Sequence, residues 1–247
     1  MRIGAAILLA VLLTACATEA PRMGASQIDA ILSAPDRSEA DRANDKRRKA
    51  PQMLALIDAR PGMRVLDLGA GGGYTTELLA RSVGPTGQVY AQNTAYALKN
   101  FVKGRFDARS KAPAMRNVIH HVADFDDPVP AAVAAGSLDL VTFMFNYHDL
   151  GWVGTDRARM NRAIFAALKR GGHYIVADHS GRPGTGISES KTLHRVEEAL
   201  VRKEVEAAGF KLVEEATFLR NPNDPRDKSV FKPTQPNDEF VLKFVKP

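Results

Sequence analysis

The stretch that decides the fold is Val65-Leu66-Asp67-Leu68-Gly69-Ala70-Gly71-Gly72-Gly73-Tyr74. A hydrophobic run ends in glycines, and residues of helical character, including Leu78 and Leu79, follow at once. Glycine is needed where a backbone turns sharply and where a ligand must touch the main chain. The stretch therefore predicts a strand, a tight ligand-facing turn and a helix in immediate succession.

The spacing of these glycines separates two kinds of nucleotide-binding turn. Gly69, Gly71 and Gly73 form a G-x-G-x-G pattern. The dinucleotide fingerprint needs glycine at the sixth place of the motif, and Tyr74 stands there instead. An oxidoreductase that uses NAD is therefore a disfavoured alternative.

Strand and helix patterns alternate along the rest of the chain. Apolar runs predict strands at residues 64–68, 87–91, 118–122, 138–145, 174–177, 211–218 and 239–245. We expect a helix over 160–168 to be stopped by Gly171 and Gly172, and another helix to run from 193 to 209. Alternating strands and helices predict a mostly parallel sheet that is covered on both faces.

The glycine spacing resembles motif I of the class I methyltransferases, which bind S-adenosylmethionine at this turn. Other stretches are similar to further strand ends of that family: Gly87-Gln88-Val89-Tyr90, Ala123-Asp124-Phe125, Ser137-Leu138-Asp139-Leu140-Val141 and Leu168-Lys169-Arg170-Gly171-Gly172. The resemblance spans nearly all of the chain after its first 60 residues. It implies an α/β fold with a doubly wound, seven-stranded, mostly parallel, Rossmann-like sheet and an antiparallel last strand.

The resemblance also implies contacts to the amino acid end of the cofactor. Gly69, Gly71 and Gly73 would face the amino acid and ribose parts of S-adenosylmethionine. Asp67 would reach its amino group through a charge-assisted hydrogen bond. Asn146, in the turn after the fourth strand, would belong to the same binding site.

At the adenosine end, Asp124 would accept a hydrogen bond from the adenine amino group, with Phe125 beside the ring. The second strand of this family usually ends in Asp or Glu, which holds both ribose hydroxyls. Here the strand ends in Asn93, whose amide would take that place. Losing the carboxylate would weaken the contact by about 1–2 kcal/mol.

Two polar clusters follow the fourth and fifth predicted strands. Asn146-Tyr147-His148-Asp149 and Ala177-Asp178-His179-Ser180 resemble, together with the glycine turn, a bacterial family of predicted methyltransferases. Because the carboxyl ends of parallel strands meet at one edge of a sheet, we predict a catalytic site of His148, Asp149, Asp178 and His179. His148 or His179 would act as a base where the acceptor must lose a proton.

A metal site is the alternative for these polar residues, since some methyltransferases use a divalent ion here. The spacing of His148, Asp149, Asp178 and His179 matches no metal motif, so no metal is predicted. His194 opens the next helix and could point toward the same strand ends. For any one histidine alone, a structural hydrogen-bonding role is the simpler interpretation, but two clusters at neighbouring strand ends favour a site.

The chain gives little reason to expect nucleic acid as a partner. Its 34 Lys+Arg against 28 Asp+Glu leave a net charge of +6 over 247 residues, and the excess is spread out. The Asn-Pro-Pro-aromatic motif of amino-methylating nucleic-acid enzymes is absent, because Asn146-Tyr147-His148 lacks both prolines. His120 and His121 fall on an expected edge strand, where exposure explains them.

A basic helix precedes the glycine turn. Ser38-Glu39-Ala40-Asp41 has the form of a capping box. The helix that follows carries Arg42, Lys46, Arg47, Arg48 and Lys49. A solvated helix face is the preferred interpretation, and a patch for an anionic ligand or a membrane surface is the alternative.

Residues 1–15 have the features of a bacterial lipoprotein signal peptide. Arg2 precedes an apolar run over 3–13 that is short for a membrane span. Leu13-Thr14-Ala15-Cys16 resembles a lipobox, and Cys16 is the only cysteine of the chain. We therefore expect lipid on Cys16, rather than a buried N-terminal helix with an incidental cysteine.

The expected organisation is a lipid-anchored tether and short helix over 16–35 and a methyltransferase-like domain over 36–247. By resemblance to lipoprotein sorting in Gram-negative bacteria, Ala17 in place of Asp favours the outer membrane, on the periplasmic side. The sequence thus predicts an exported, S-adenosylmethionine-dependent methyltransferase with a small-molecule or lipid-like acceptor. Because S-adenosylmethionine is made in the cytoplasm, an exported binding domain that kept the pocket without catalysis is the alternative.

Overall fold

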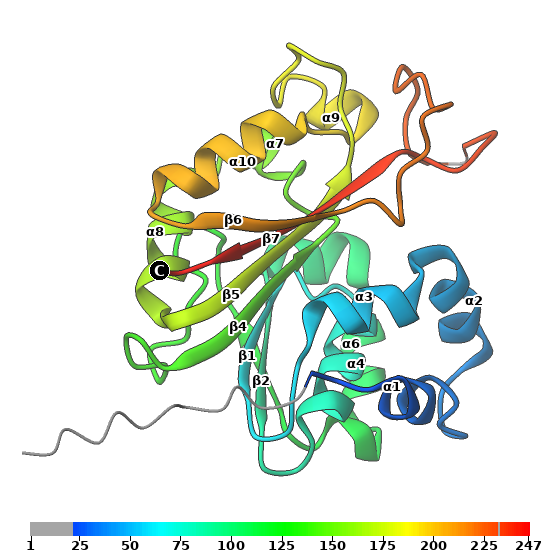
Figure 1. The fold of residues 1–247 in the computed structure, drawn as a ribbon, viewed down its shortest axis with the longest axis vertical. Helices are drawn as coiled ribbons and strands as arrows, with labels where there is room; N and C mark the ends of the chain where they lie inside the picture. The colour runs from blue at the N-terminus through cyan, green and yellow to red at the C-terminus, as the bar shows by residue number, and fades with distance from the viewer. Residues whose placement is uncertain (1–21, 232) are drawn as a thin grey trace, which may run out of the picture.

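The computed structural model describes residues 22–231 and 233–247. In this part of the chain, seven strands form one sheet in the order β3-β2-β1-β4-β5-β7-β6 (Figure 1). They are β1 (Arg64–Leu68), β2 (Gln88–Asn93), β3 (Val118–Val122), β4 (Leu138–Met144), β5 (Leu168–His179), β6 (Lys211–Ala216) and β7 (Glu239–Val245). The predicted signal segment and Cys16 lie outside the described residues. No helix within those residues is both long and apolar enough to cross a membrane.

The pairing of the strands confirms the predicted fold class. β1 pairs in parallel with β2 and β4, β3 adds to β2, and β5 adds to β4. β7 runs antiparallel to both β5 and β6. Because the strand order reverses at β1 and β4, the carboxyl ends of these two strands flank the place where such sheets bind ligands.

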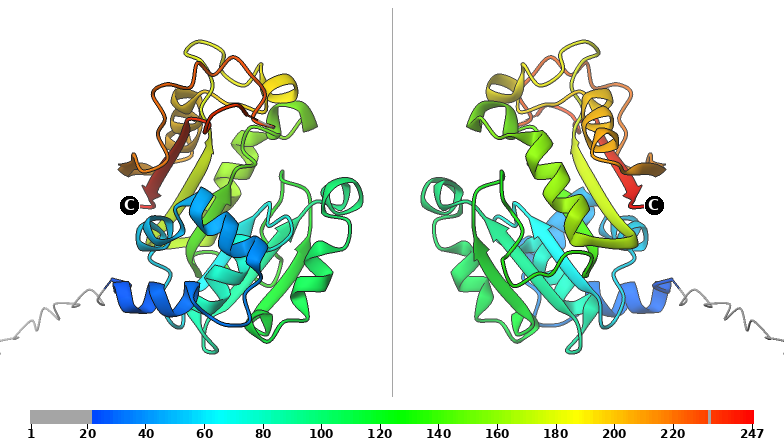
Figure 2. Two further views of the ribbon diagram at one scale, coloured as in Figure 1. Left: turned by 90° about the vertical axis from the view of Figure 1, so that its right-hand side faces the viewer. Right: turned by 90° about the vertical axis from the view of Figure 1, so that its left-hand side faces the viewer.

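Helices cover both faces of the sheet. On one face lie α3 (Ala50–Ile57) and α4 (Tyr74–Val83), and on the other α8 (Arg157–Ala167) and α10 (Glu198–Ala207). The two views of Figure 2 face these two sides in turn. Shorter elements are α1 (Ala25–Leu32), α5 (Ala95–Ala97), η1 (Leu98–Val102), α6 (Arg105–Ser110), η2 (Pro113–Met115), α7 (Leu150–Val153) and α9 (Ser190–Leu193).

Several boundaries differ from the sequence prediction: β2 is Gln88–Asn93 rather than 87–91, β5 is Leu168–His179 rather than 174–177, and β6 ends at Ala216 rather than 218. Helix α8 ends at Ala167, before the glycine pair, because Gly171 and Gly172 lie within β5, where the pairing with β4 is irregular. The helix expected over 193–209 is broken, since α9 ends at Leu193 and α10 begins at Glu198.

Helix α2 (Glu39–Arg48) is attached to the domain by charged side chains. Only Asp41 among its residues is fully buried. The Ser38 hydroxyl accepts a hydrogen bond from the Asp41 N–H at 3.1 Å, which confirms the predicted cap. An apolar face therefore does not hold this helix in place.

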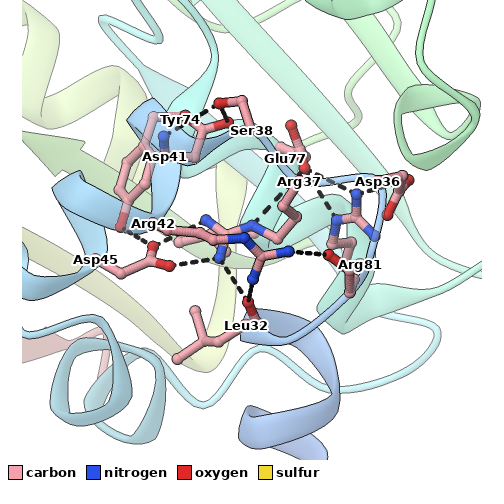
Figure 3. A network of polar contacts seen from close by, with 12 residues as sticks. Leu32, Asp36, Arg37, Ser38, Asp41, Arg42, Asp45, Tyr74, Glu77 and Arg81 are labelled. Carbon is pink, nitrogen blue, oxygen red and sulfur yellow. Dashed lines mark hydrogen bonds and ion pairs between the residues drawn. The ribbon is translucent and has the colours of Figure 1, made fainter.

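A network of polar contacts holds α2 against α4 instead (Figure 3). Arg37 donates to both carboxylate oxygens of Asp45, at 2.6 and 2.8 Å, and the Tyr74 hydroxyl donates to Asp45 at 2.7 Å. Arg81 donates to Asp36 at 2.9 Å. These contacts place α2 beside the glycine turn, because Tyr74 is both the first residue of α4 and a partner of Asp45.

Candidate functional site

The glycine turn between β1 and α4 has the backbone that its sequence predicts. Gly69 and Gly71 adopt left-handed conformations, with φ of 59° and 56°, which side chains disfavour. A β-carbon on Gly69 would lie 3.0 Å from the Asn146 amide. A β-carbon on Gly71 would meet only the Gly69 carbonyl oxygen, at 3.8 Å. The main chain at Gly71 therefore borders open space that a ligand can enter.

Asn93, at the end of β2, braces this turn. Its Oδ1 accepts a hydrogen bond from the Gly71 N–H at 2.8 Å, and its Nδ2 donates to the Gly71 carbonyl at 3.3 Å. The side chain is buried. Both polar groups of the amide, which the sequence assigned to ribose hydroxyls, are therefore directed at the glycine turn in this structure.

Asp67 is buried at the end of β1 with both carboxylate oxygens bonded to hydroxyls. Thr76 donates at 2.6 Å and Thr142 at 2.8 Å. Burial raises the pKa of Asp67 to about 6, although these hydrogen bonds and the charge of Arg48 lower it. At neutral pH the residue is a buried anion with no direct ion pair among the described residues.

Arg48, in the last turn of α2, is the main site residue that the sequence analysis missed. It was assigned to a solvated helix face, but its guanidinium lies 3.6 Å from the centre of the Phe145 ring. Its Nε is buried and has no hydrogen-bond partner among the described residues. Burial lowers the pKa of Arg48 to about 9, so the group remains a cation at neutral pH.

Two cavities meet at the glycine turn. One, of about 900 Å³, lies between α2, the turn and α6. The other, of about 610 Å³, lies over the carboxyl ends of β1, β2, β4 and β5. The two share a wall of Arg47, Arg48, Gly69, Gly71, Arg105 and Asn146. Each cavity has the size of a small-molecule site.

The mouth of the strand-end cavity is aromatic. Tyr96 and Phe101 are each 54% exposed, and Phe231 is 65% exposed. The rings of Tyr96 and Trp152 meet edge to face with centroids 5.9 Å apart. These residues come from α5, η1, α7 and a loop near the C-terminus, so no single sequence motif predicts them. Exposed aromatic rings at a cavity mouth favour an apolar ligand.

His148 and Asp178, predicted to meet at the strand ends, form a buried hydrogen-bonded pair. The two atoms His148 Nδ1 and Asp178 Oδ1 are 2.7 Å apart, and Asp178 Oδ2 accepts from the His148 N–H at 2.8 Å. Burial lowers the pKa of His148, but Asp178 and Asp149 outweigh it and raise the pKa to about 10. The two carboxylates therefore favour the charged form of His148 in the absence of a bound cation. Asp178 is fully buried.

The remaining predicted catalytic residues lie beside that pair. Asp149 Oδ1 is 3.3 Å from His148 Nε2 and 3.4 Å from His194 Nδ1. His179 Nδ1 is 3.0 Å from Glu239 Oε1. His148, Asp149, His179 and His194 all line the strand-end cavity. The structure therefore brings together the histidines and acidic residues that the sequence placed at two strand ends.

Three predicted positions differ from expectation. Asp124 is exposed and lines neither cavity, whereas its neighbour Phe125 lines the strand-end cavity. Gly73, with φ of 85°, precedes α4 and packs near Arg109, also away from both linings. His120, on the edge strand β3, is half-buried and stacks on Phe106 with centroids 4.1 Å apart, so exposure does not explain it.

Comparisons with known proteins agree with this geometry. A family model described as a methyltransferase domain matches residues 59–217. The ubiquinone/menaquinone biosynthesis C-methyltransferase of Vibrio vulnificus is 31% identical over 122 residues, which are 49% of this chain and 43% of that protein. The chain spans less than half the length of the curated relatives it matches.

Solved structures share the fold. A SAM-dependent methyltransferase from Aquifex aeolicus superposes with a TM-score of 0.59, covering 92% of this chain and 100% of that chain at 16% identity. Aeropyrum pernix fibrillarin, crystallised with natively bound S-adenosyl-L-methionine, superposes with a TM-score of 0.50 at 18% identity, covering 76% of this chain and 68% of that chain. At these identities the likeness concerns the fold.

Proposed function

Because this chain belongs to the methyltransferase domain family, we propose that it binds S-adenosylmethionine at the glycine turn and transfers its methyl group to a small, lipid-like acceptor. The observation that carries the proposal is the open space beside Gly71, at the carboxyl end of β1. At this residue the main chain borders the strand-end cavity without a side chain in between. A cofactor in that position would lie next to the polar strand ends.

The residues at the turn fit the amino acid end of this cofactor, which carries a carboxylate and an ammonium group. Arg48, whose buried Nε lacks a partner among the described residues, would hold the carboxylate. Asp67, a buried anion whose oxygens are bonded only to hydroxyls, would attract the ammonium group. Phe125 would offer a ring to the adenine.

Bound there, S-adenosylmethionine supplies a methyl group activated by a sulfonium. The contribution of the chain is to align the acceptor with that group, because direct displacement depends mainly on alignment. His148, Asp149 and His179 line the acceptor side of the cavity and would position the acceptor. Asp178 would hold the His148 ring in place through its 2.7 Å contact.

The aromatic mouth supports a lipid-like acceptor over a nucleic acid. Tyr96, Phe101 and Phe231 are exposed around the entrance, where an apolar molecule would bury them. The relatives from Vibrio are named for ubiquinone and menaquinone biosynthesis, which supports an apolar acceptor here too. Other relatives are named as rRNA 2'-O-methyltransferases, so RNA belongs among the acceptors to be tested.

Calorimetry with S-adenosylmethionine and its demethylated product tests the cofactor site. We expect Gly71→Val to abolish binding, because the side chain would enter the cavity and the backbone would be strained. Gly62→Val is the matched control, since Gly62 also has a positive φ, of 84°, but precedes β1 at the opposite end. Binding that survives in Gly71→Val, or is absent from the wild type, contradicts the proposal. Binding without turnover on any acceptor would support the non-catalytic alternative.

We also propose that lipid on Cys16 anchors the protein to the outer membrane, on the periplasmic side. Its support is the lipobox and the single cysteine in the sequence. Helix α1 of the expected tether packs on the domain, with Ile28 buried against Leu54 and Leu78. Fractionation tests the anchor: the wild type should sediment with outer membranes and Cys16→Ala should not. A wild-type protein found only in the cytosol would contradict it.

A further inference from the structure

Three side chains from two distant segments converge in the strand-end cavity. His148 and Asp149 follow β4, and His194 lies just after α9 in a left-handed conformation, with φ of 54°. One potential ligand atom from each lies within 4.8 Å of the others. The break between α9 and α10 therefore brings a second imidazole to Asp149.

We propose that His148, Asp149 and His194 bind a divalent transition-metal ion of the zinc type. Two ligand atoms at about 2.1 Å from a tetrahedral ion lie about 3.4 Å apart. The carboxylate oxygen of Asp149 is 3.3 Å from His148 Nε2 and 3.4 Å from His194 Nδ1, which matches that separation. Two imidazoles and one carboxylate suit zinc and its neighbours better than magnesium or calcium.

Asp178 gives the site the outer support that metal-binding histidines have. A ligating histidine usually donates its other ring N–H to a carboxylate, which fixes the orientation of the ring. His148 directs Nδ1 at Asp178, 2.7 Å away, and so presents Nε2 to Asp149. Asp178 is itself fixed by the backbone N–H groups of His148 and His179, at 2.8 and 2.7 Å.

Three protein ligands leave room for a further ligand on the ion. All three residues line the cavity of about 610 Å³ with the aromatic mouth, so the open position would face that space. An oxygen or sulfur atom of a molecule in the cavity could fill it. The sequence predicted no metal because His194 is 45 residues after Asp149, and no spacing motif links them. The metal site would exist whether or not the chain transfers methyl groups.

Titration of the full chain, without a histidine tag, with Co²⁺ tests the site. We expect one Co²⁺ per chain and visible absorption bands of a four- or five-coordinate nitrogen and oxygen site. His194→Asn should weaken Co²⁺ binding by more than about 100-fold. Asparagine is chosen because it tolerates the left-handed backbone at this position. Asp178→Asn should weaken it by about 10–100-fold. His121→Asn, on the edge strand β3, is the matched control and should bind as the wild type does.

Metal-free melting temperatures of all four proteins verify that the variants fold. Competition with Zn²⁺ should abolish the cobalt bands at one equivalent. Failure of the wild type to bind Co²⁺, equal binding by His194→Asn, or a sulfur-to-cobalt band that assigns the metal to Cys16 would each overturn the proposal. None of these readouts requires methyltransferase activity, so the metal site and the proposed function fail separately.

Discussion

Helix α2 presents two kinds of charge to the domain. In its body, Asp41 accepts from Arg109 at 2.8 and 2.9 Å, and Asp45 accepts from Arg37 at 2.6 and 2.8 Å. In its last turn, Arg48 has a buried Nε that no described residue pairs. Charges of the first kind stabilise the fold, because each has its counter-ion. A buried charge of the second kind destabilises the free protein, and we propose that a ligand supplies the missing partner.

The largest expected effect comes from breaking the paired region. Arg37→Ala would leave Asp45 without its bidentate partner, and the Arg37 side chain is only 1% exposed. We expect the free energy of unfolding to fall by about 3 kcal/mol. Arg202→Ala, which breaks an exposed pair with Glu206, is the control and should change it by less than about 0.5 kcal/mol. If urea unfolding shows similar losses of unfolding free energy in the two variants, the buried pair contributes no more to stability than the exposed one.

The pH dependence of stability tests Asp67, a second buried charge that has no direct ion pair among the described residues. Burial raises its pKa from 3.8 to about 6, so its contribution to stability is complete below pH 3.8 and is lost as the pH rises through about 6. Relative to Asp67→Asn, the wild type should lose up to about 3 kcal/mol of unfolding free energy over that range. Unfolding curves from pH 4 to 7 measure the difference. Parallel pH dependence in the two proteins would show that Asp67 is not a buried anion.

Arg48→Met separates stability from binding. Removing an unpaired buried charge should leave the melting temperature unchanged or higher. The affinity for S-adenosylmethionine should fall by about 10–100-fold, the loss of one charged hydrogen bond. Lys46→Met, on the exposed side of the same helix, is the control for both measurements. A lower melting temperature with unchanged affinity would show that Arg48 stabilises the fold and does not bind the cofactor.

The smallest effect on cofactor binding is expected at Asn93, because both polar groups of its amide are directed at the glycine turn. In Asn93→Asp, one oxygen keeps the bond from the Gly71 N–H, but the other would face the Gly71 carbonyl that Nδ2 now reaches at 3.3 Å. We expect the variant to lose at least about 1 kcal/mol of stability at pH 7, because the buried carboxylate must either face that carbonyl oxygen or take up a proton. Tighter binding of S-adenosylmethionine in this variant would instead support the ribose-facing role predicted from the sequence.

The fold could be predicted because its signals are local and repeated. The central strands are apolar runs, and the run over residues 138–145 corresponds to the buried β4, one residue shorter. The meeting of His148 with Asp178 was also predictable, since parallel neighbours end at the same edge. The bounds of β5 could not be predicted, because Gly171 and Gly172, expected to stop a helix, lie in an irregular stretch within that strand.

Arg48 and His194 could not be predicted for different physical reasons. Arg48 shares a helix face with Asp41 and Asp45, but a face made of charges gives no apolar periodicity to detect. His194 reaches the site only because the chain turns left-handed between α9 and α10, where the apolar spacing suggested one continuous helix. Asp124 shows the reverse case, a motif position that the structure leaves exposed.

The charged attachment of α2 makes ionic strength a control on access to the cofactor cavity. The sheet is held by apolar burial, which many salts leave intact or strengthen, whereas the partly exposed ion pairs of Asp41 with Arg109 and of Asp36 with Arg81 weaken as salt screens them. The buried pair of Arg37 with Asp45 is screened much less. Added sodium chloride should therefore loosen α2 while the strands stay closed. Amide hydrogen exchange would then quicken over residues 39–48 well before it changes in β1 or β4. Helix α2, which carries Arg48, would then cover the cavity at low salt and expose it at high salt.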